Sequence, residues 1–257
     1  MNETLRKFIV TDSSDIPSSE CNSASCVHLI YKINEKGVLQ RAPIYSSSKR
    51  SLMGIYDYGG LSLCNTDVLI RDIMVEINRR NYLGVLLDFA DDPSIYDVIQ
   101  RIDYSLSQRH ILHFLPVSMA QLSKDAKLII PSSISGGSFI EMIEFYAEKY
   151  PPSRLCMEIV RSRNRFKMPS YKPEGEFLSN DDFAKLTAQF SPSMFFSSDL
   201  ACKYFTYRDN DETFFVLYDD AETAVHKIRI AEKYNFFATF LLYSEWGEYT
   251  KAIVSAK

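Results

Sequence analysis

The chain has 257 residues, 46% of them hydrophobic and 24% charged, a composition that excludes collagen, a coiled coil and a disordered chain. Its 29 basic and 33 acidic residues give a formal charge of −4, and because nucleic-acid-binding domains are usually basic, we expect no nucleic-acid partner. No segment approaches the ~18 consecutive apolar residues of a membrane span.

The N-terminal region shows no targeting segment and no metal motif. One short apolar patch is followed by polar residues, so no signal peptide is visible and a cytoplasmic location is expected. The five cysteines include no CxxC pair and no histidine at zinc spacing, which predicts reduced thiols and no metal site. The sequence leaves open whether Cys21 and Cys26, in a Ser-rich segment, form a disulfide.

Short apolar runs recur along the whole chain. Several are almost wholly apolar, which is typical of parallel strands buried on both faces beneath helices. The runs are 8–10, 26–31, 52–56, 84–89, 110–117, 128–130, 155–160, 194–196 together with 214–218, and 236–242.

Helical patterns separate several of these runs. The clearest covers 222–234, where apolar residues such as Ala224 and Ile228 predict an inward face and Lys227 is assigned to the outward face. Two further helical patterns cover 67–80 and 139–147.

About eight strands, most followed by a helix or a long connection, predict an α/β fold. In roughly 250 residues this number is typical of a (β/α)8 TIM barrel. We therefore expect a single domain over 1–257, with 162–179 as an extended loop inside it. An open doubly wound sheet is the alternative, but its glycine-rich phosphate loop is missing.

The fourth run ends in the sequence YLGVLLDFADDP, residues 82–93. Asp88 interrupts this apolar strand, so its carboxyl group must find partners or shift its pKa. Asp91 and Asp92 precede Pro93, a pattern typical of a helix cap. The segment resembles the DGxDxDxE signature of family 18 glycoside hydrolases, the chitinase family.

Two other segments carry the same resemblance. The segment YFTYRDNDETFFVLYDDAETAVHKIRIAEKYNFFATFLLYSEW, 204–246, is similar to the spore-germination branch of that family, whose members hydrolyse peptidoglycan. The segment CVHLIYKINEKGVLQ, 26–40, resembles the family's second strand and its Asn-x-x-Gly turn. The resemblance implies a family 18-like barrel and, besides the cytoplasm, a spore-associated location.

The chain departs from the family pattern at several strand ends. Ala90 stands where the family has its proton-donating Glu, and the loss of general acid catalysis typically costs about 100- to 10,000-fold in rate. Asp88 matches the family's Asp that orients the substrate acetamido group. The sixth-strand Met-x-Tyr-Asp falls near 130–133 and the final-strand Trp falls near Leu242. These departures predict a catalytically degenerate barrel.

Other side chains near predicted strand ends are candidates for ligand contacts. Two carboxylates about 5 to 9 Å apart could still hydrolyse a glycoside; the candidates are Asp57, Glu158, Asp219, Asp220 and Glu245. Aromatic rings near the strand ends can stack on sugars. Arg161, Arg163 and Arg165 occupy every second position, so in an extended segment they share one face, which either receives an anionic group or is solvated. With Asp88 as the retained acid, the expected substrate-binding residues are Tyr56, Tyr58, Ser132, Arg161, Tyr218, Asp219, Tyr243, Glu245 and Trp246.

Three functions follow from these patterns. The favoured one is a degenerate chitinase-like barrel that binds an N-acetylglucosamine-containing glycan, such as peptidoglycan or chitin, or a protein partner in the former active-site cleft. The alternatives are an active glycosidase that uses Asp88 with a relocated acid, and a structural or assembly protein without a small ligand. No cofactor is expected in any of them.

Overall fold

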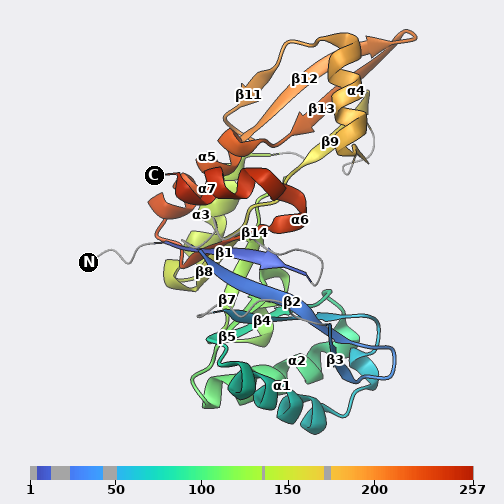
Figure 1. Ribbon diagram of the computed structural model, residues 1–257. Helices are drawn as coiled ribbons and strands as arrows, with labels where there is room; N and C mark the ends of the chain where they lie inside the picture. The colour runs from blue at the N-terminus through green and yellow to red at the C-terminus, as the bar shows by residue number, and fades with distance from the viewer. Residues whose placement is uncertain (1–4, 13–23, 43–50, 135–136, 171–174, 257) are drawn as a thin grey trace.

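Eight parallel strands form a closed barrel in the computed structural model, which describes residues 5–12, 24–42, 51–134, 137–170 and 175–256 (Figure 1). The strand β1 pairs with β2 on one side and with β14 on the other, which closes the sheet on itself. The predicted (β/α)8 barrel is therefore confirmed. Its strands are β1 (Arg6–Thr11), β2 (Ser25–Ile33), β4 (Leu52–Asp57), β5 (Gly84–Asp88), β6 (Leu112–Pro116), β7 (Lys127–Pro131), β8 (Leu155–Glu158) and β14 (Ala238–Leu242).

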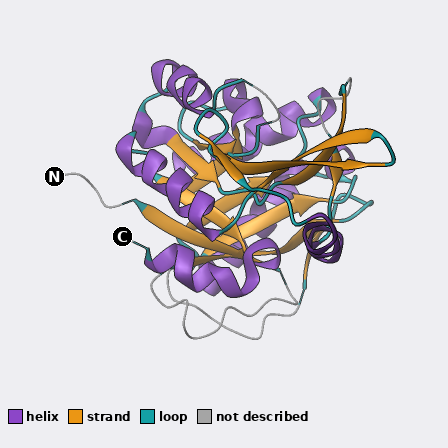
Figure 2. Ribbon diagram, turned by 90° about the horizontal axis from the view of Figure 1, so that it is seen from above, coloured by secondary structure: helices purple, strands orange, loops and turns teal. Residues whose placement is uncertain are grey.

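Helices cover the outside of the barrel (Figure 2). The helix α1 buries Leu69, Ile73 and Ile77, the face that its apolar period predicts. The predicted turn after β2 is also present, since Asn34 accepts the backbone N–H groups of Lys36 and Val38 before the short antiparallel strand β3 (Leu39–Arg41). The helices are α1 (Thr66–Arg80), α2 (Tyr96–Gln108), α3 (Phe139–Lys149), α5 (Ala221–Lys233), α6 (Tyr243–Trp246) and α7 (Thr250–Ser255).

Aromatic rings fill the barrel interior. Phe8 stacks on Phe240 with ring centroids 5.1 Å apart, and Phe114 meets Phe240 edge-on at 5.2 Å. All three side chains are almost completely buried. Such ring pairs stabilise the folded state beyond the area that they bury. Packed aromatic side chains thus fill the middle of the barrel.

A second sheet stands beside the barrel between β8 and α5, and it projects at the top of Figure 1. It is antiparallel in the order β10-β9-β13-β12-β11, and its buried side chains include Phe205, Val216 and Leu186. We call this part, residues 163–218, the insertion. Its elements are β9 (Arg163–Met168), β10 (Glu176–Phe177), α4 (Asn180–Phe190), β11 (Phe195–Ser197), β12 (Cys202–Asp209) and β13 (Glu212–Tyr218).

The insertion corrects two sequence predictions. The runs 194–196 and 214–218 lie in its antiparallel sheet and not in the barrel, and 162–179 contains β9 and β10 where an extended loop was expected. Aromatic and β-branched residues favour either kind of strand, so the apolar run 214–218 carried no signal of its partner strand. The other eight predicted runs are the eight strands of the barrel.

A buried ion pair connects the end of the insertion to the barrel. Asp219 follows β13, and its two carboxylate oxygens accept hydrogen bonds from Lys227 Nζ at 2.8 and 2.9 Å. Each side chain of the pair is 1% exposed. Thr223 and the backbone N–H of Ser162 also donate to Asp219. The outward assignment of Lys227 is therefore wrong: its charge is turned inward because Asp219 compensates it there.

We expect the substitution Asp219→Ala to lower the free energy of unfolding by about 3 to 5 kcal/mol, because it leaves the Lys227 ammonium buried without a countercharge. Urea denaturation at neutral pH measures the change. Glu232→Ala, on the exposed face of α5, is the control and should change stability by less than about 0.5 kcal/mol. A loss of under about 1 kcal/mol in Asp219→Ala would contradict this account of the pair.

Candidate functional site

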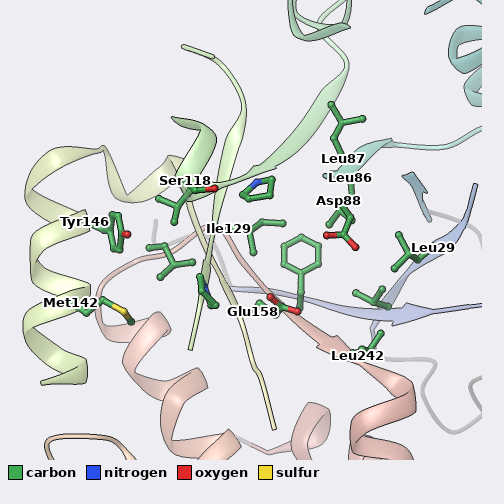
Figure 3. Close-up of a pocket in the computed structure, with 16 residues that line it drawn as sticks. Leu29, Leu86, Leu87, Asp88, Ser118, Ile129, Met142, Tyr146, Glu158 and Leu242 are labelled. Atoms are coloured by element: carbon green, nitrogen blue, oxygen red, sulfur yellow. The ribbon is translucent and has the colours of Figure 1, made fainter. Parts of the chain in front are cut away.

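A cavity of about 500 Å³ opens at the carboxyl ends of the barrel strands (Figure 3). Six barrel strands contribute the residue at or next to their carboxyl end to its lining. This is the end of a (β/α)8 barrel that holds the active sites of barrel enzymes, and the volume is that of a small-molecule site. The six residues are Val10, Asp88, Pro116, Pro131, Glu158 and Leu242.

Most of the cavity wall is aliphatic. Phe240, one ring of the barrel's aromatic core, also lines the cavity, and Tyr146 of α3 is the other aromatic residue in its lining. The wall therefore has few polar atoms that could form hydrogen bonds with a sugar, so recognition of a sugar would depend on those few groups. The aliphatic residues away from the strand ends include Leu29, Leu86, Ile129 and Met142.

Two carboxyl groups, Asp88 and Glu158, stand in this wall. Each is the last residue of its strand, β5 and β8 respectively, and Figure 3 shows both turned into the cavity. The Asp88 side chain is accessible from the open cavity, yet the protein around it displaces enough water to raise the pKa of its carboxyl group. Asp88 is therefore placed where a ligand in the cavity would meet it.

Glu158 is the more strongly perturbed acid. Burial raises the pKa of its carboxyl group to about 7, and the negative charges of Asp88 and Glu245 contribute to the rise. The effect of Asp88 on Glu158 means that the two carboxyl groups interact across the cavity. A carboxyl group with a pKa of about 7 can donate a hydrogen bond at neutral pH, and the oxygens of a second carboxyl group can accept one. At neutral pH the cavity can therefore both donate and accept a hydrogen bond.

The residues after Asp88 do not supply another acid to the cavity. Ala90 is exposed and lies outside the lining. Asp92 caps the short 3-10 helix Pro93–Ile95 by accepting the backbone N–H of Ser94 at 2.8 Å, as the Asp-Pro pattern predicts. Asp91 accepts a hydrogen bond from the Tyr96 hydroxyl. Both side chains are thus bound to neighbouring residues.

Three of the predicted substrate-binding residues are buried among protein atoms. Ser132 accepts the backbone N–H of Val160 at 3.0 Å and is fully buried. Trp246 is also fully buried, and its Nε1 donates to the carbonyl of Ile159 at 2.8 Å. Tyr218 lies in the core of the insertion, beside α4. The structure does not bring these three side chains to the cavity.

The other predicted substrate-binding residues also lie outside the cavity lining. Tyr56 stands beside Asp88 in the register of β4 and β5, and Tyr58 is 64% exposed on the surface. Tyr243, the first residue of α6, is partly buried and packs against the hydrophobic core. Asp219 is held by Lys227, and Glu245 and Arg161 bind each other through the hydrogen bonds described below.

The structure thus joins Asp88 with one further sequence candidate, Glu158. The sequence analysis named five acids near strand ends as candidates. Of these five, Glu158 lines the cavity in the closed barrel. The aliphatic wall was missed. Its signal was present in the apolar residues Ile129, Ile130 and Pro131 at the end of the sixth barrel strand, all of which line the cavity.

The described part of the chain contains no group of three or more His, Cys, Asp or Glu residues that could hold a metal ion. Cys64, Cys156 and Cys202 are free thiols, and the suggested pairing of Cys21 with Cys26 involves a residue, Cys21, that lies outside the described ranges. In the same described ranges, every helix is too short or too polar to cross a membrane.

Comparison with known proteins shows which fold this is. No model of a protein family matches the chain, and no curated protein matches it. Solved structures do match. A chitinase from Chromobacterium violaceum has a TM-score of 0.67 and 12% identity over 96% of this chain and 97% of its own. A plant class V chitinase mutant from Cycas revoluta, in complex with (GlcNAc)3, has a TM-score of 0.67 and 13% identity over 97% and 98%.

A spore enzyme matches as well. The spore cortex-lytic enzyme SleL from Bacillus megaterium has a TM-score of 0.63 and 14% identity, and the match covers 96% of this chain and 74% of that enzyme. The chain therefore has the fold of the family 18 chitinases and of these spore cortex-lytic enzymes, as its sequence resemblance indicates. At these identities the likeness concerns the fold.

The raised pKa of Glu158 predicts a pH-dependent stability. The folded protein retains a proton that the unfolded chain releases above its ordinary pKa of 4.5, so stability is lost as the pH rises from about 4.5 to about 7. The loss amounts to roughly 3 kcal/mol at most. Glu158→Gln should remove it, so that relative to wild type the variant gains stability between pH 4 and pH 8. Urea unfolding at both pH values measures this gain.

The matched control for this measurement is Glu248→Gln, which makes the same substitution at an exposed carboxyl group. Its difference from wild type should be the same at both pH values. If Glu158→Gln and Glu248→Gln show the same pH dependence, Glu158 does not titrate as described.

Proposed function

We propose that this chain is a catalytically degenerate chitinase-like barrel that binds an N-acetylglucosamine-containing glycan, of the peptidoglycan or chitin type, in the cavity. One observation carries the proposal: the acid matched to the family's acetamido-orienting Asp, Asp88, is retained and faces the open cavity, whereas Ala90, at the proton-donor position, lies outside it. The site keeps a group that positions the ligand and lacks the group that cleaves it.

The two carboxyl groups fit an acetamido sugar. The carboxyl oxygens of Asp88 accept hydrogen bonds from an amide N–H or a sugar hydroxyl, and a protonated Glu158 donates one to a carbonyl oxygen. The aliphatic wall suits the acetamido methyl group and the apolar face of a pyranose ring. A structural protein without a ligand would fill the barrel mouth with its own side chains, so the open volume counts against that alternative.

An active glycosidase with a relocated acid is the second candidate, and Glu158 favours it. With a pKa of about 7, Glu158 is the type of acid that can protonate a leaving oxygen at neutral pH, with Asp88 orienting the acetamido group. Against it, Pro131 and Leu242 line the cavity near the positions of the family's Tyr-Asp and Trp. Those polar and aromatic contacts to the sugar are absent from the described cavity wall.

Binding and turnover on one sample separate the two candidates. We expect chito-oligosaccharides or muropeptides to bind by calorimetry and to remain uncleaved in product analysis. Asp88→Ala should weaken binding about 10-fold or more, because it removes a hydrogen bond to a charged group. Asp91→Asn is the matched control, since Asp91 lies three residues on and binds Tyr96 outside the cavity, and it should bind as wild type does.

Either of two results would overturn the proposal. Cleavage that is lost in Glu158→Gln and retained in Asp91→Asn would establish the second candidate. If none of the glycans tested binds, the proposal of a glycan ligand is wrong, and a protein partner is the remaining ligand class for the cavity.

Restoration of the missing acid tests how much of the ancestral site is left. We expect Ala90→Glu to produce no cleavage of chitin or peptidoglycan, because residue 90 is exposed and its side chain lies outside the cavity lining. Release of reducing ends from chito-oligosaccharides is the measurement. A gain of cleavage would show that the rest of the hydrolytic site survives in this barrel.

A further inference from the structure

A second hollow, of about 460 Å³, lies where the insertion meets the barrel. It shares no lining residue with the cavity described above. Arg161, which follows β8, and Arg163, which begins β9, both line it. We propose that this hollow is a binding site for a carboxylate group, and that the two guanidinium groups receive it.

Arg163 is a buried cation that forms no ion pair among the described residues. The residue is 8% exposed, and its Nε atom is buried with no hydrogen-bond partner. Among the described residues, its guanidinium forms no ion pair, and its closest recorded contact is the Phe177 ring, 5.6 Å from Cζ to the ring centroid. Buried charges are normally paired, because an unpaired one loses its hydration without compensation. The guanidinium of Arg163 therefore has N–H donors available for a ligand at the wall of the hollow.

Arg161 places a second cation beside the first. Its Nη1 donates to the backbone carbonyl of Glu245 at 2.7 Å, and its Nε is buried without a partner. The guanidinium lies between two rings, 5.1 Å from Tyr249 and 5.4 Å from Trp246. Burial and the charge of Arg161 both lower the pKa of Arg163. The two like charges are thus close enough to repel each other, a cost that a bound anion relieves.

The Glu245 carboxylate is the nearby negative charge that acts on Arg163. It does not provide a direct ion pair for both guanidinium groups. Its Oε2 accepts the backbone N–H of Arg161 at 3.2 Å, and its charge acts in favour of protonated Arg163. One carboxylate thus faces two guanidinium groups and, in the part of the chain that the structure describes, accepts no hydrogen bond from either guanidinium. A carboxylate from a ligand would give the Arg163 guanidinium the direct hydrogen-bonded partner that Glu245 does not provide.

Each of the other charged residues that line the hollow is already in an ion pair. Lys203 donates to Asp220 and to Glu222, both at 2.5 Å, and Asp219 is held by Lys227. These acidic side chains disfavour a doubly charged phosphate in the same hollow. A planar, singly charged carboxylate fits the guanidinium fork with two parallel hydrogen bonds and brings less repulsion.

Arg165 provides an internal control. It is on the same strand as Arg163, two residues on, but its Nη2 donates to Glu176 at 2.5 Å and its side chain is 29% exposed. The sequence treats the three alternating arginines alike, whereas the structure pairs Arg165 and leaves Arg163 unpaired.

Two sources can supply the carboxylate: a free small carboxylic acid, or a carboxylate substituent on the glycan of the proposed function. Only the second source rests on that function. N-acetylmuramic acid and N-acetylglucosamine differ by one lactyl ether, which carries the carboxylate, and lactate presents that group alone. These three compounds are therefore the probes.

Trp246 reports binding directly, because it is the chain's single Trp and its ring lies 5.4 Å from the Arg161 guanidinium. We expect lactate or N-acetylmuramic acid to change its fluorescence saturably. Arg163→Met should weaken that binding about 10-fold or more, Arg163→Lys should weaken it partially because the fork is lost and the charge is kept, and Arg165→Met should leave it unchanged. Calorimetry on the same samples gives the affinities.

The outcomes are distinct. Lactate binding that depends on Arg163 supports the site even if N-acetylglucosamine does not bind, in which case the proposed glycan function fails alone. A preference for N-acetylmuramic acid over N-acetylglucosamine that Arg163→Met abolishes assigns the carboxylate to the glycan. The proposal is overturned if no carboxylate binds, or if Arg163→Met and Arg165→Met bind alike. Should Arg163→Met fail to fold, the comparison of Arg163→Lys with Arg165→Met decides.

Discussion

Closure of the sheet at β1 is the constraint on which the site depends. This strand pairs with β2 and with β14, and its Phe8 stacks on Phe240 inside the barrel. In an open sheet, the ends of β5 and β8 would be three strand spacings apart along one edge, about 14 Å. Curvature of the closed sheet turns Asp88 and Glu158 toward a common space instead, so that the charge of one acid raises the pKa of the other.

The apolar wall determines what these acids can do. Desolvation is the largest cause of the raised pKa values of both Asp88 and Glu158, so the same aliphatic side chains that remove sugar contacts also keep Glu158 protonated near neutral pH. A protonated acid is useful to a binding protein as a hydrogen-bond donor and to a hydrolase as a proton donor. The two candidate functions therefore share one electrostatic origin and differ in whether a glycosidic oxygen reaches Glu158.

The hydrophobic periodicity of the sequence was sufficient to predict the strands of the barrel. It was not sufficient to predict the specific side-chain contacts within the fold. The eight barrel strands and the faces of α1 and α3 follow from local patterns, because burial on one or both faces imposes a period on each element. Lys227 was misassigned because its partner, Asp219, precedes the helix and the pattern describes only the helix. Trp246 drew attention as an aromatic residue near a strand end, but a hydrogen bond to Ile159 directs its ring into the core. Such pairings depend on tertiary contacts that a periodic pattern does not contain.

Glu245 interacts electrostatically with charged groups at both hollows. Its charge contributes to the raised pKa of Glu158. Burial raises the pKa of Glu245 itself, and the charges of Arg163 and Arg161 oppose that rise. An anion bound by the two arginines would offset part of their positive charge and add a negative charge near Glu245. Both changes favour the protonated state of the neighbouring acids, Glu158 included. Occupancy of the arginine site would therefore extend to higher pH the range in which the cavity offers a proton or a hydrogen-bond donor, which gives the pair of hollows a physical reason to act together.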